Sequence, residues 1–237
     1  MSKVKTDAIE TRAGGTSVLT IGTATQTIKL PGGTPGAGKY LQSDADGDAS
    51  WATVSTTSDI ELLNTYEPSG VADVEITTAA YFSSTYKSLI FKFMSMHPVT
   101  DNVHLRMQIG TGVGPTYAAL FYTNFGIMQS NGGTNWWQYE GSYGGSGNWA
   151  SLFATLFKEV GNQDFQSCAG ELEIANPSSA AFYSQYQSKF NGDLYHDYQL
   201  TSFGGGSYRS IAPITAVRFY FNSGNIDSGI IKVYGLR

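Results

Sequence analysis

Aromatic side chains set among small polar residues are the feature of this sequence best suited to binding chemistry. Residues 136–149 read WWQYEGSYGGSGNW. Rigid rings in such surroundings form adaptable recognition surfaces, and their flat faces suit sugar rings. The ring-bearing candidates in this stretch are Trp136, Trp137, Tyr139, Tyr143 and Trp149. The alternative is that these rings pack inside a domain or between subunits.

A second stretch, residues 203–208 (FGGGSY), has the same character and adds Tyr208 to the candidates. Glycine and serine next to aromatic residues are typical of loops. We interpret both stretches as loops that could present rings to a glycan or another surface receptor.

Two carboxylates could support hydrolysis. Glu171 and Glu173 would leave the same side of one strand about 7 Å apart, a separation compatible with the carboxylate pair of an inverting glycosidase. Alternating charges on the solvent face of a strand explain them more simply. The sequence contains no Gly-x-Ser-x-Gly nucleophile motif, and we predict that the protein is not an enzyme.

Two motifs resemble cofactor sites but lack essential residues. Residues 33–39 (GTPGAGK) have the spacing of a phosphate-binding loop, but Tyr40 stands where a Ser or Thr must reach Mg²⁺. Three aspartates in residues 44–48 resemble the start of a calcium loop, but Ser55 occupies the position of the required Glu. An Asp-Gly hairpin turn is the better interpretation of residues 44–48. The three histidines have no metal-ligand spacing, so we predict no cofactor and no metal.

Composition excludes several classes of partner. Only 14% of residues are charged, the net charge is −5, and no cluster of Lys and Arg is present, so we expect no nucleic-acid binding. The single cysteine, Cys168, allows no intrachain disulfide and is expected to be buried. The sequence has neither a signal-peptide pattern nor an apolar run of membrane-spanning length. We therefore expect no membrane insertion and synthesis in a cytoplasm.

The N-terminal part has the pattern of short strands joined by tight turns. Apolar and polar residues alternate over residues 4–10, and further strand-like runs cover residues 17–21 and 25–30, with Gly and Pro between them. These runs contain too few large apolar residues to bury a core within one chain. The pattern therefore predicts an intertwined oligomer, and so a fibre or an assembly component.

We expect a domain boundary near residue 58. Residues 1–57 would form an attachment and shaft region, with residues 52–59 as a small polar linker. Residues 58–237 show strand alternation with turn signals such as Asn191-Gly192 between the strands, and residues 152–157 fit either a strand or a short helix. The segments with the clearest alternation are residues 89–93, 103–109, 171–174, 217–221 and 231–234. We predict an all-β protein whose second domain is an antiparallel β-sandwich, jelly-roll-like in topology.

Residues 38–51 (GKYLQSDADGDASW) resemble a hairpin found in tail fibres and related virion proteins of bacteriophages, and residues 3–10 and 14–21 resemble fibre shaft segments. Residues 223–235 are similar to the C-terminal segment of virion proteins of marine tailed phages. The resemblance implies a homotrimer with a β-rich shaft and a distal β-sandwich knob. It transfers no ligand-binding residue.

From these observations we expect a trimeric structural protein of a virion, a tail fibre or tail tip, made in the cytoplasm of the host. The N-terminal region would contact other tail or head proteins, and the C-terminal knob would bind a host-surface glycan or receptor. Two alternatives stay open. One is a head fibre, capsid decoration or tail-assembly component that binds no receptor, and the other is a polysaccharide-degrading fibre.

Overall fold

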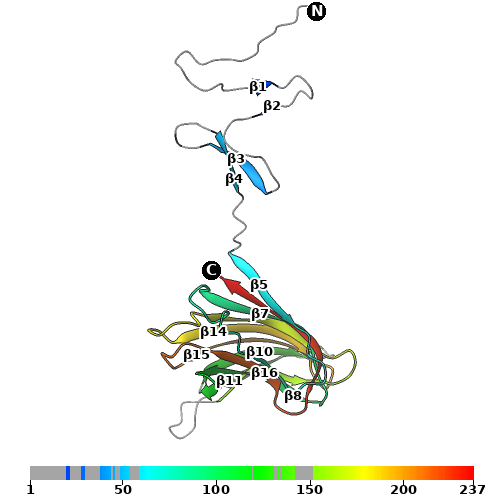
Figure 1. Cartoon of the computed structure of the whole chain (residues 1–237). Coiled ribbons are helices and arrows are strands. Elements are labelled where there is room, and N and C mark those ends of the chain that lie inside the picture. Colours follow the sequence, from blue (N-terminus) through cyan, green and yellow to red (C-terminus); the bar gives the residue numbers. More distant parts are fainter. Residues whose placement is uncertain are drawn as a thin grey trace, which may run out of the picture. The chain divides into compact units, whose positions relative to one another are not determined.

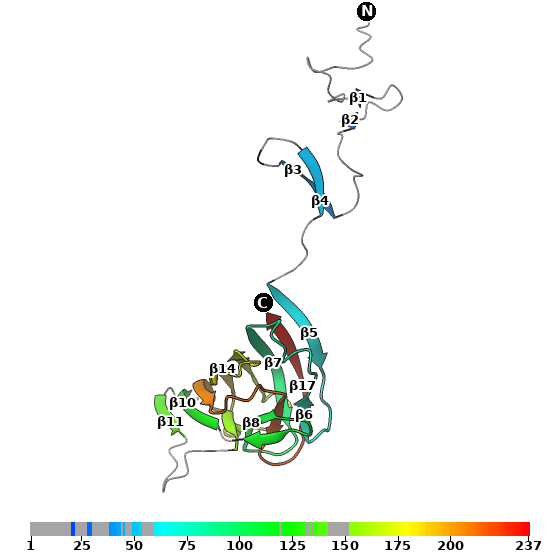
Figure 2. The same ribbon diagram turned by 60° about the vertical axis from the view of Figure 1, so that its left-hand side comes forward.

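The computed structural model describes residues 20–21, 28–29, 38–43, 45, 49–53, 59–118, 120–130, 133, 135–141 and 152–237. Regular structure in these ranges consists of strands alone, without a helix, and every paired strand is antiparallel (Figures 1 and 2). The predicted all-β class is therefore confirmed. The chain divides into an N-terminal unit, Met1–Ser58, and a C-terminal unit, Asp59–Arg237.

Two strand pairs make up the described part of the N-terminal unit. Strand β1 (Thr20–Ile21) pairs with β2 (Ile28–Lys29), and β3 (Lys39–Ser43) pairs with β4 (Ala49–Thr53). The hairpin expected in residues 38–51 is thus present, with Leu41 opposite Trp51. Of the linker expected over residues 52–59, Ala52 and Thr53 belong to β4, and residues 54–58 lie outside the described residues. The strand expected over residues 4–10 lies outside the described residues.

The β3–β4 hairpin buries little apolar surface. Every residue of β3 is exposed, and Tyr40 and Leu41 keep 46% and 44% of their surface accessible. A two-stranded hairpin without a covered apolar face is marginal in water.

The described residues of the C-terminal unit form thirteen strands. Their bounds are β5 (Ile60–Tyr66), β6 (Asp73–Ile76), β7 (Ser88–Pro98), β8 (Val103–Thr111), β9 (Thr116–Ala118), β10 (Leu120–Gln129), β11 (Asn135–Gly141), β12 (Ala154–Val160), β13 (Cys168–Ala175), β14 (Ser184–Asp193), β15 (Gln199–Tyr208), β16 (Ala216–Phe221) and β17 (Ile226–Leu236). Residues 152–157, which fit either a strand or a helix by sequence, lead into and form the first part of β12.

These strands form two sheets. The larger has eight strands in the order β11-β10-β15-β14-β13-β7-β17-β5, and the smaller has the order β12-β8-β16-β6, with β9 paired to β8. Strands β5 and β7 lie in the larger sheet while β6 and β8 lie in the smaller one, so the chain alternates between the sheets there.

One hydrophobic core joins the two sheets. The ring of Phe91 in β7 lies 5.2 Å from that of Phe219 in β16, edge to face, and Phe93 contacts Phe219 in the same way at 4.9 Å. The predicted alternation is confirmed: the inward positions are at most 3% exposed in the segments that contain Phe91, Leu105, Leu172, Phe219 and Val233. Cys168 is also buried, as expected.

Two predicted turns or loops are instead strands. The Asn191-Gly192 pair lies inside β14, where a Cβ on Gly192 would come within 2.5 Å of the Ser167 carbonyl oxygen. Residues 203–208 lie inside β15, where a Cβ on Gly204 would lie 2.6 Å from Ser188 Oγ. In both places glycine permits close packing against a neighbouring strand rather than a turn.

Both ends of the C-terminal unit lie together. The Arg237 amide donates to the Asp59 carbonyl oxygen at 2.9 Å, and Figure 1 shows the C-terminus beside the start of β5. The connections that follow β7 and β14 lie at the opposite end of the strands, because Pro98 pairs with Ile226, whereas Ser88 pairs with Leu236.

Candidate functional site

A row of side chains crosses the outer face of the eight-stranded sheet. In each strand these residues alternate with core residues, as Lys92 does between buried Phe91 and Phe93. Strand register places each member opposite the next, so the row runs perpendicular to the strands. In strand order from β17 to β10, its members are Lys232, Lys92, Glu171, Lys189, Phe203 and Phe125. The row is therefore charged over β17 to β14 and aromatic over β15 and β10.

A second row lies beside the first, nearer to the end where Asp59 and Arg237 meet. Ile90 pairs with Glu173, Glu173 with Gln187, and Gln187 with Gly205. Gly205 contributes no side chain, so this row stops next to Phe203.

A groove of about 380 Å³ lies between the two rows and crosses β7, β13, β14 and β15. We call it the outer groove. Its walls are the side chains of both rows, and the intervening residues Leu172, Ser188 and Gly204 also line it. Because it is built on paired strands, its side chains are fixed by the sheet rather than by a loop.

The polar groups of the outer groove are arranged in pairs. Lys92 forms an ion pair with Glu171, and both side chains are about half exposed, at 47% and 51%. Gln187 Nε2 donates to Glu173 Oε2 at 3.0 Å. The Lys189 ammonium lies 5.7 Å from the centroid of the Phe203 ring. Exposed ion pairs contribute only about 0–1 kcal/mol to stability, so these contacts orient the groups more than they hold the fold.

The outer groove therefore contains hydrogen-bond donors, hydrogen-bond acceptors and one aromatic ring face. Phe203 keeps 42% of its surface accessible. A few convergent polar groups beside an aromatic side chain are the ordinary composition of a ligand site. Such a site can accept the hydroxyls of a sugar and pack against one face of its ring.

The predicted aromatic residues occupy different places. Trp136, Trp137 and Tyr139 lie in β11 rather than in a loop. Register places Tyr139 opposite Phe125, Trp137 opposite Ile127, and Trp136 opposite the buried Met128. Tyr143 and Trp149 lie outside the described residues.

Tyr208 does not belong to a recognition surface. It is 1% exposed, and its hydroxyl hydrogen-bonds to Thr111 Oγ1 at 3.4 Å. Its position at the end of β15 faces the core, because alternation from exposed Phe203 brings residue 208 to the inner side. The prediction of Tyr208 as a receptor contact is corrected on this ground.

Sequence reasoning singled out the stretch that contains Phe203, and it considered Glu171 and Glu173, but it missed Lys92, Gln187 and Lys189. These residues are adjacent only through strand pairing. The signal available in the sequence was alternation, which assigns each residue to a face but gives no neighbour across the sheet.

The cofactor-like motifs give no site among the described residues. Strand β3 begins at Lys39, where a phosphate-binding loop would open a helix. Residues 46–48 of the calcium-like segment lie outside the described residues. Within the described ranges, no group of three or more His, Cys, Asp or Glu side chains is arranged to hold a metal ion. The same ranges contain no helix long and apolar enough to span a membrane.

Comparison with known proteins gives no relative from which to transfer a function. No family model matches the chain, and no curated protein or solved structure matches it.

Proposed function

We propose that the chain is a homotrimeric fibre protein of a virion, in the tail fibre or tail tip, whose C-terminal unit recognises a host-surface glycan. The observation that carries recognition is the outer groove, where Phe203 stands beside the paired side chains of Glu173 and Gln187. Sugar hydroxyls can exchange hydrogen bonds with these polar groups while a ring face packs on Phe203.

The oligomeric part of the proposal is supported by the β3–β4 hairpin. Its exposed Tyr40 and Leu41 need a partner surface, and identical hairpins from neighbouring chains would supply one. Closing such strands around a common core would also cover their unpaired edges. Three identical glycan sites on one trimer would then gain strength through avidity, so that each single site can be weak.

The strand order supports a jelly-roll topology for the knob. Strands β5, β17, β7 and β13 are neighbours in one sheet, and β6, β16, β8 and β12 in the other. Two four-stranded sheets between which successive strands alternate are expected of a jelly roll. Strands β9 to β11 and β14 to β15 are then additions to this core. Strand β9 pairs with β8 in the smaller sheet, whereas β10, β11, β14 and β15 extend the larger sheet toward the aromatic half of the row.

A glycan array probed with the full-length protein tests recognition. For any glycan bound, Phe203→Ala should weaken binding roughly tenfold, the equivalent of about 1.4 kcal/mol. Phe182→Ala is the matched control, because Phe182 is also exposed, at 73%, but lies before β14 rather than at the outer groove. Equal binding by the Phe203 variant and the unmodified protein would remove the outer groove from the proposal.

Light scattering tests the oligomer independently. We expect the mass of a trimer for the full chain of 25.5 kDa and a weakened or dissociated trimer after removal of residues 1–57. A monomer that is unaffected by the truncation would contradict the fibre.

The second candidate function is a head fibre, capsid decoration or tail-assembly component without a receptor. It is favoured by Ile60 and Leu62, each 51% exposed on the edge strand β5, because exposed apolar side chains on an edge strand suit a protein interface. Labelling on intact particles, together with a test of whether the purified protein blocks adsorption, separates the two candidates.

We propose no catalytic role for the chain. In the outer groove Glu171 is paired with Lys92, and Glu173 accepts a hydrogen bond from Gln187, so each carboxylate has its own stabilising partner. Release of oligosaccharides from host polysaccharide that is lost in Glu171→Gln or Glu173→Gln would establish the polysaccharide-degrading alternative.

A further inference from the structure

A second cavity lies at the end of the C-terminal unit opposite Asp59 and Arg237. Its volume is about 490 Å³, and its lining includes Ser95, His97, Asp164, Phe165 and Asp227. We call it the end pocket. Its walls come from the last residues of β7, the first residues of β17 and the connection between β12 and β13.

The connection that forms one wall, residues 161–167, is held by a buried glutamine. Gln166 is 1% exposed, and its Nε2 donates to the Leu194 carbonyl oxygen at 3.0 Å and to Asp197 Oδ1 at 2.9 Å. Its Oε1 accepts from the Gln163 amide at 3.2 Å. This side chain therefore joins residues 161–167 to the connection after β14, and it satisfies three polar groups at once.

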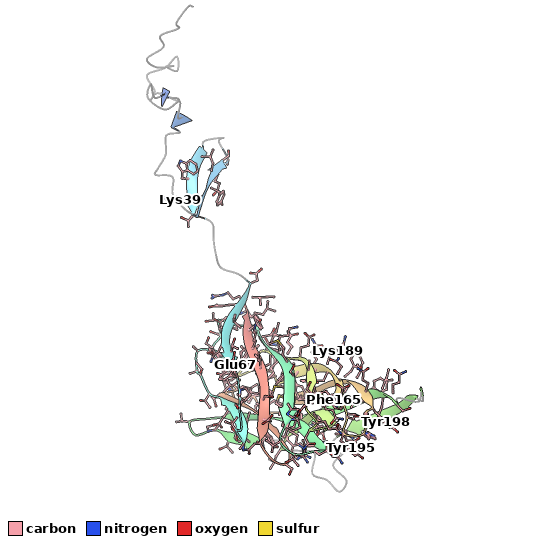
Figure 3. All side chains as sticks on the ribbon, turned by 90° about the vertical axis from the view of Figure 1, so that its right-hand side faces the viewer. Lys39, Glu67, Phe165, Lys189, Tyr195 and Tyr198 are labelled. Atoms are coloured by element: carbon pink, nitrogen blue, oxygen red, sulfur yellow. The ribbon has the colours of Figure 1, made fainter. Side chains whose placement is uncertain are left out.

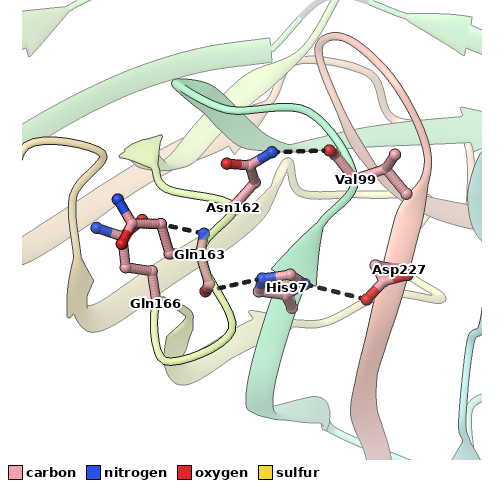
Figure 4. Close-up of polar contacts among 6 residues, drawn as sticks. All are labelled: His97, Val99, Asn162, Gln163, Gln166 and Asp227. Atoms are coloured by element: carbon pink, nitrogen blue, oxygen red, sulfur yellow. Dashed lines mark hydrogen bonds and ion pairs between the residues drawn. The ribbon is translucent and has the colours of Figure 1, made fainter.

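His97 in β7 hydrogen-bonds to residues 161–167, the segment that forms this wall, and contacts Asp227 in β17 (Figure 4). Its Nε2 lies 3.1 Å from the Gln163 carbonyl oxygen, and its Nδ1 lies 3.2 Å from Asp227 Oδ2. A carbonyl oxygen can only accept, so Nε2 is the donor in the first contact. Asn162 adds a further attachment, from its Nδ2 to the Val99 carbonyl oxygen at 3.1 Å. A wall held at several points is ordered before a ligand arrives, which lowers the entropic cost of binding.

The ordered wall presents an aromatic ring to solvent. Phe165 lines the pocket together with its sequence neighbours Asp164 and Gln166, and 68% of its surface is exposed. Tyr195, on the adjoining connection, is 37% exposed and stacks on His196 with ring centroids 4.4 Å apart. Figure 3 shows Phe165, Tyr195 and Tyr198 in one region of the unit. A single exposed ring is ordinary, but a ring on an ordered wall of a cavity is a suitable binding contact.

Acidic side chains predominate at this end of the unit. Residues 99–102, 161–167, 193–198 and 222–228, which make up the four connections here and the strand residues next to them, contain five aspartates but neither Lys nor Arg. The basic side chains beside them are the imidazoles of His97, which contacts Asp227, and His196. Two of the five, Asp164 and Asp227, line the pocket. Burial, followed by the charge of Asp197, raises the pKa of the nearby Asp193 carboxyl. The outer groove differs, because it carries both Lys and Glu.

We propose that the end pocket binds an amino sugar with a free amine. The ammonium would pair chiefly with the Asp164 carboxylate and also approach Asp227, whose Oδ2 contacts His97 Nδ1. The ring would pack on Phe165, where a cation close to an aromatic face gains further attraction. The serine hydroxyls of Ser95 and Ser228 and the exposed side of the wall would meet the sugar hydroxyls. The proposal concerns a site and a ligand chemistry separate from those of the outer groove, and it stands whether or not the outer groove binds glycans.

Matched monosaccharides test the charge preference on the full-length protein by titration calorimetry or ligand-observed NMR. Glucosamine carries the ammonium, N-acetylglucosamine keeps the ring without the charge, and glucuronate reverses the charge. We expect glucosamine to bind at least about tenfold more tightly than N-acetylglucosamine, with glucuronate weakest. Equal binding of the three sugars, or undetectable binding of glucosamine, would overturn the proposal.

Two substitutions locate the site. Asp164→Asn should lower glucosamine affinity toward that of N-acetylglucosamine, and Phe165→Ala should weaken both sugars. Asp59→Asn and Phe182→Ala are the controls, because each removes the same kind of exposed group elsewhere on the unit. Asp164 and Phe165 are both exposed, so the variants should fold, which thermal unfolding would verify.

One further probe separates the sugar from a bare amine. Nα-acetyl-lysine amide supplies an ammonium without a sugar ring. Binding as tight as that of glucosamine would overturn the assignment of an amino sugar, whereas clearly weaker binding supports it. The Asp164→Asn variant should no longer prefer glucosamine to N-acetylglucosamine but should still bind the glycan recognised at the outer groove. This pair of results would separate the end pocket from the proposed function of the outer groove.

Discussion

The guanidinium of Arg237 and the carboxylate of Glu61 lie 2.6 Å apart, from Nη2 to Oε2. The Tyr86 hydroxyl donates to the same carboxylate oxygen at 3.0 Å. These hydrogen bonds, first from Arg237 and then from Tyr86, lower the pKa of Glu61 below its ordinary value. The three side chains thus connect β5, the segment before β7 and the residue after β17.

Arg237→Gln should therefore reduce stability in a way that depends on pH. A carboxyl whose pKa is lowered by folding stabilises the folded state at pH values above its unfolded-state pKa, about 4.3. That contribution is lost as the pH falls through the lowered pKa of the folded state. Urea unfolding should show a lower midpoint for the variant at neutral pH and a smaller difference in acid. A difference of the same size at both pH values would contradict the role of the Glu61 charge.

Substitution of two phenylalanines should separate the core from the outer face. Phe91 is fully buried against Phe219, so Phe91→Ala should cost about 3–5 kcal/mol of unfolding free energy. Phe203 is 42% exposed, and Phe203→Ala should change stability by only about 0.5 kcal/mol while it weakens glycan binding. Denaturant unfolding measures the change in unfolding free energy of each variant, and the glycan array measures binding. A large loss from Phe203→Ala would mean that its ring is structural.

Cys168 should serve as a reporter of unfolding. It is fully buried, and burial raises the pKa of its thiol, so little reactive thiolate forms and reagents cannot reach it. A thiol reagent at mildly alkaline pH should leave the native protein unlabelled and modify one thiol per chain in denaturant, because the sequence has one cysteine. Rapid labelling of the native protein would show that β13 opens readily.

Gly161→Ala should loosen the wall of the end pocket. A Cβ there would overlap with Gln166 Oε1 and lie 2.9 Å from the Tyr195 Cα, so the glutamine must leave its hydrogen bonds. We expect a loss of about 1–3 kcal/mol and faster hydrogen exchange in residues 161–167.

Gly205→Ala is the matched control for Gly161→Ala. A Cβ on Gly205 would meet only the Tyr186 carbonyl oxygen, at 3.4 Å, so this variant should be nearly as stable as the unmodified protein. Equal exchange rates in residues 161–167 for both variants would contradict the role of Gln166.

The sequence predicted which residues of the strands face inward because side-chain alternation is a local property. The inward positions from Val103 to Ile109 follow from period-two patterning alone. Glycine was the misleading signal, because its freedom in turns and its lack of a side chain look the same in a sequence. At Gly192 and Gly204 the lack of a side chain is what matters, because neighbouring atoms pack where a Cβ would lie.

The candidate site was less predictable for a different reason. Lys92, Glu171, Lys189 and Phe203 are far apart in the chain and meet through the register of four strands. Register depends on the whole sheet, so no spacing in the sequence predicts that Lys189 lies opposite Phe203. The end pocket was missed in the same way, because His97, Phe165 and Asp227 come from three separate segments.

Most side chains that line the outer groove come from every second residue of strands whose remaining residues face the core. Lys189, for example, stands between buried Ser188 and Phe190. Substitutions in one set of positions therefore leave the other set in place. Under the proposed recognition of glycans, exchanging the outward residues of β13 to β15 one at a time would therefore change the preferred ligand while the inward residues keep the fold.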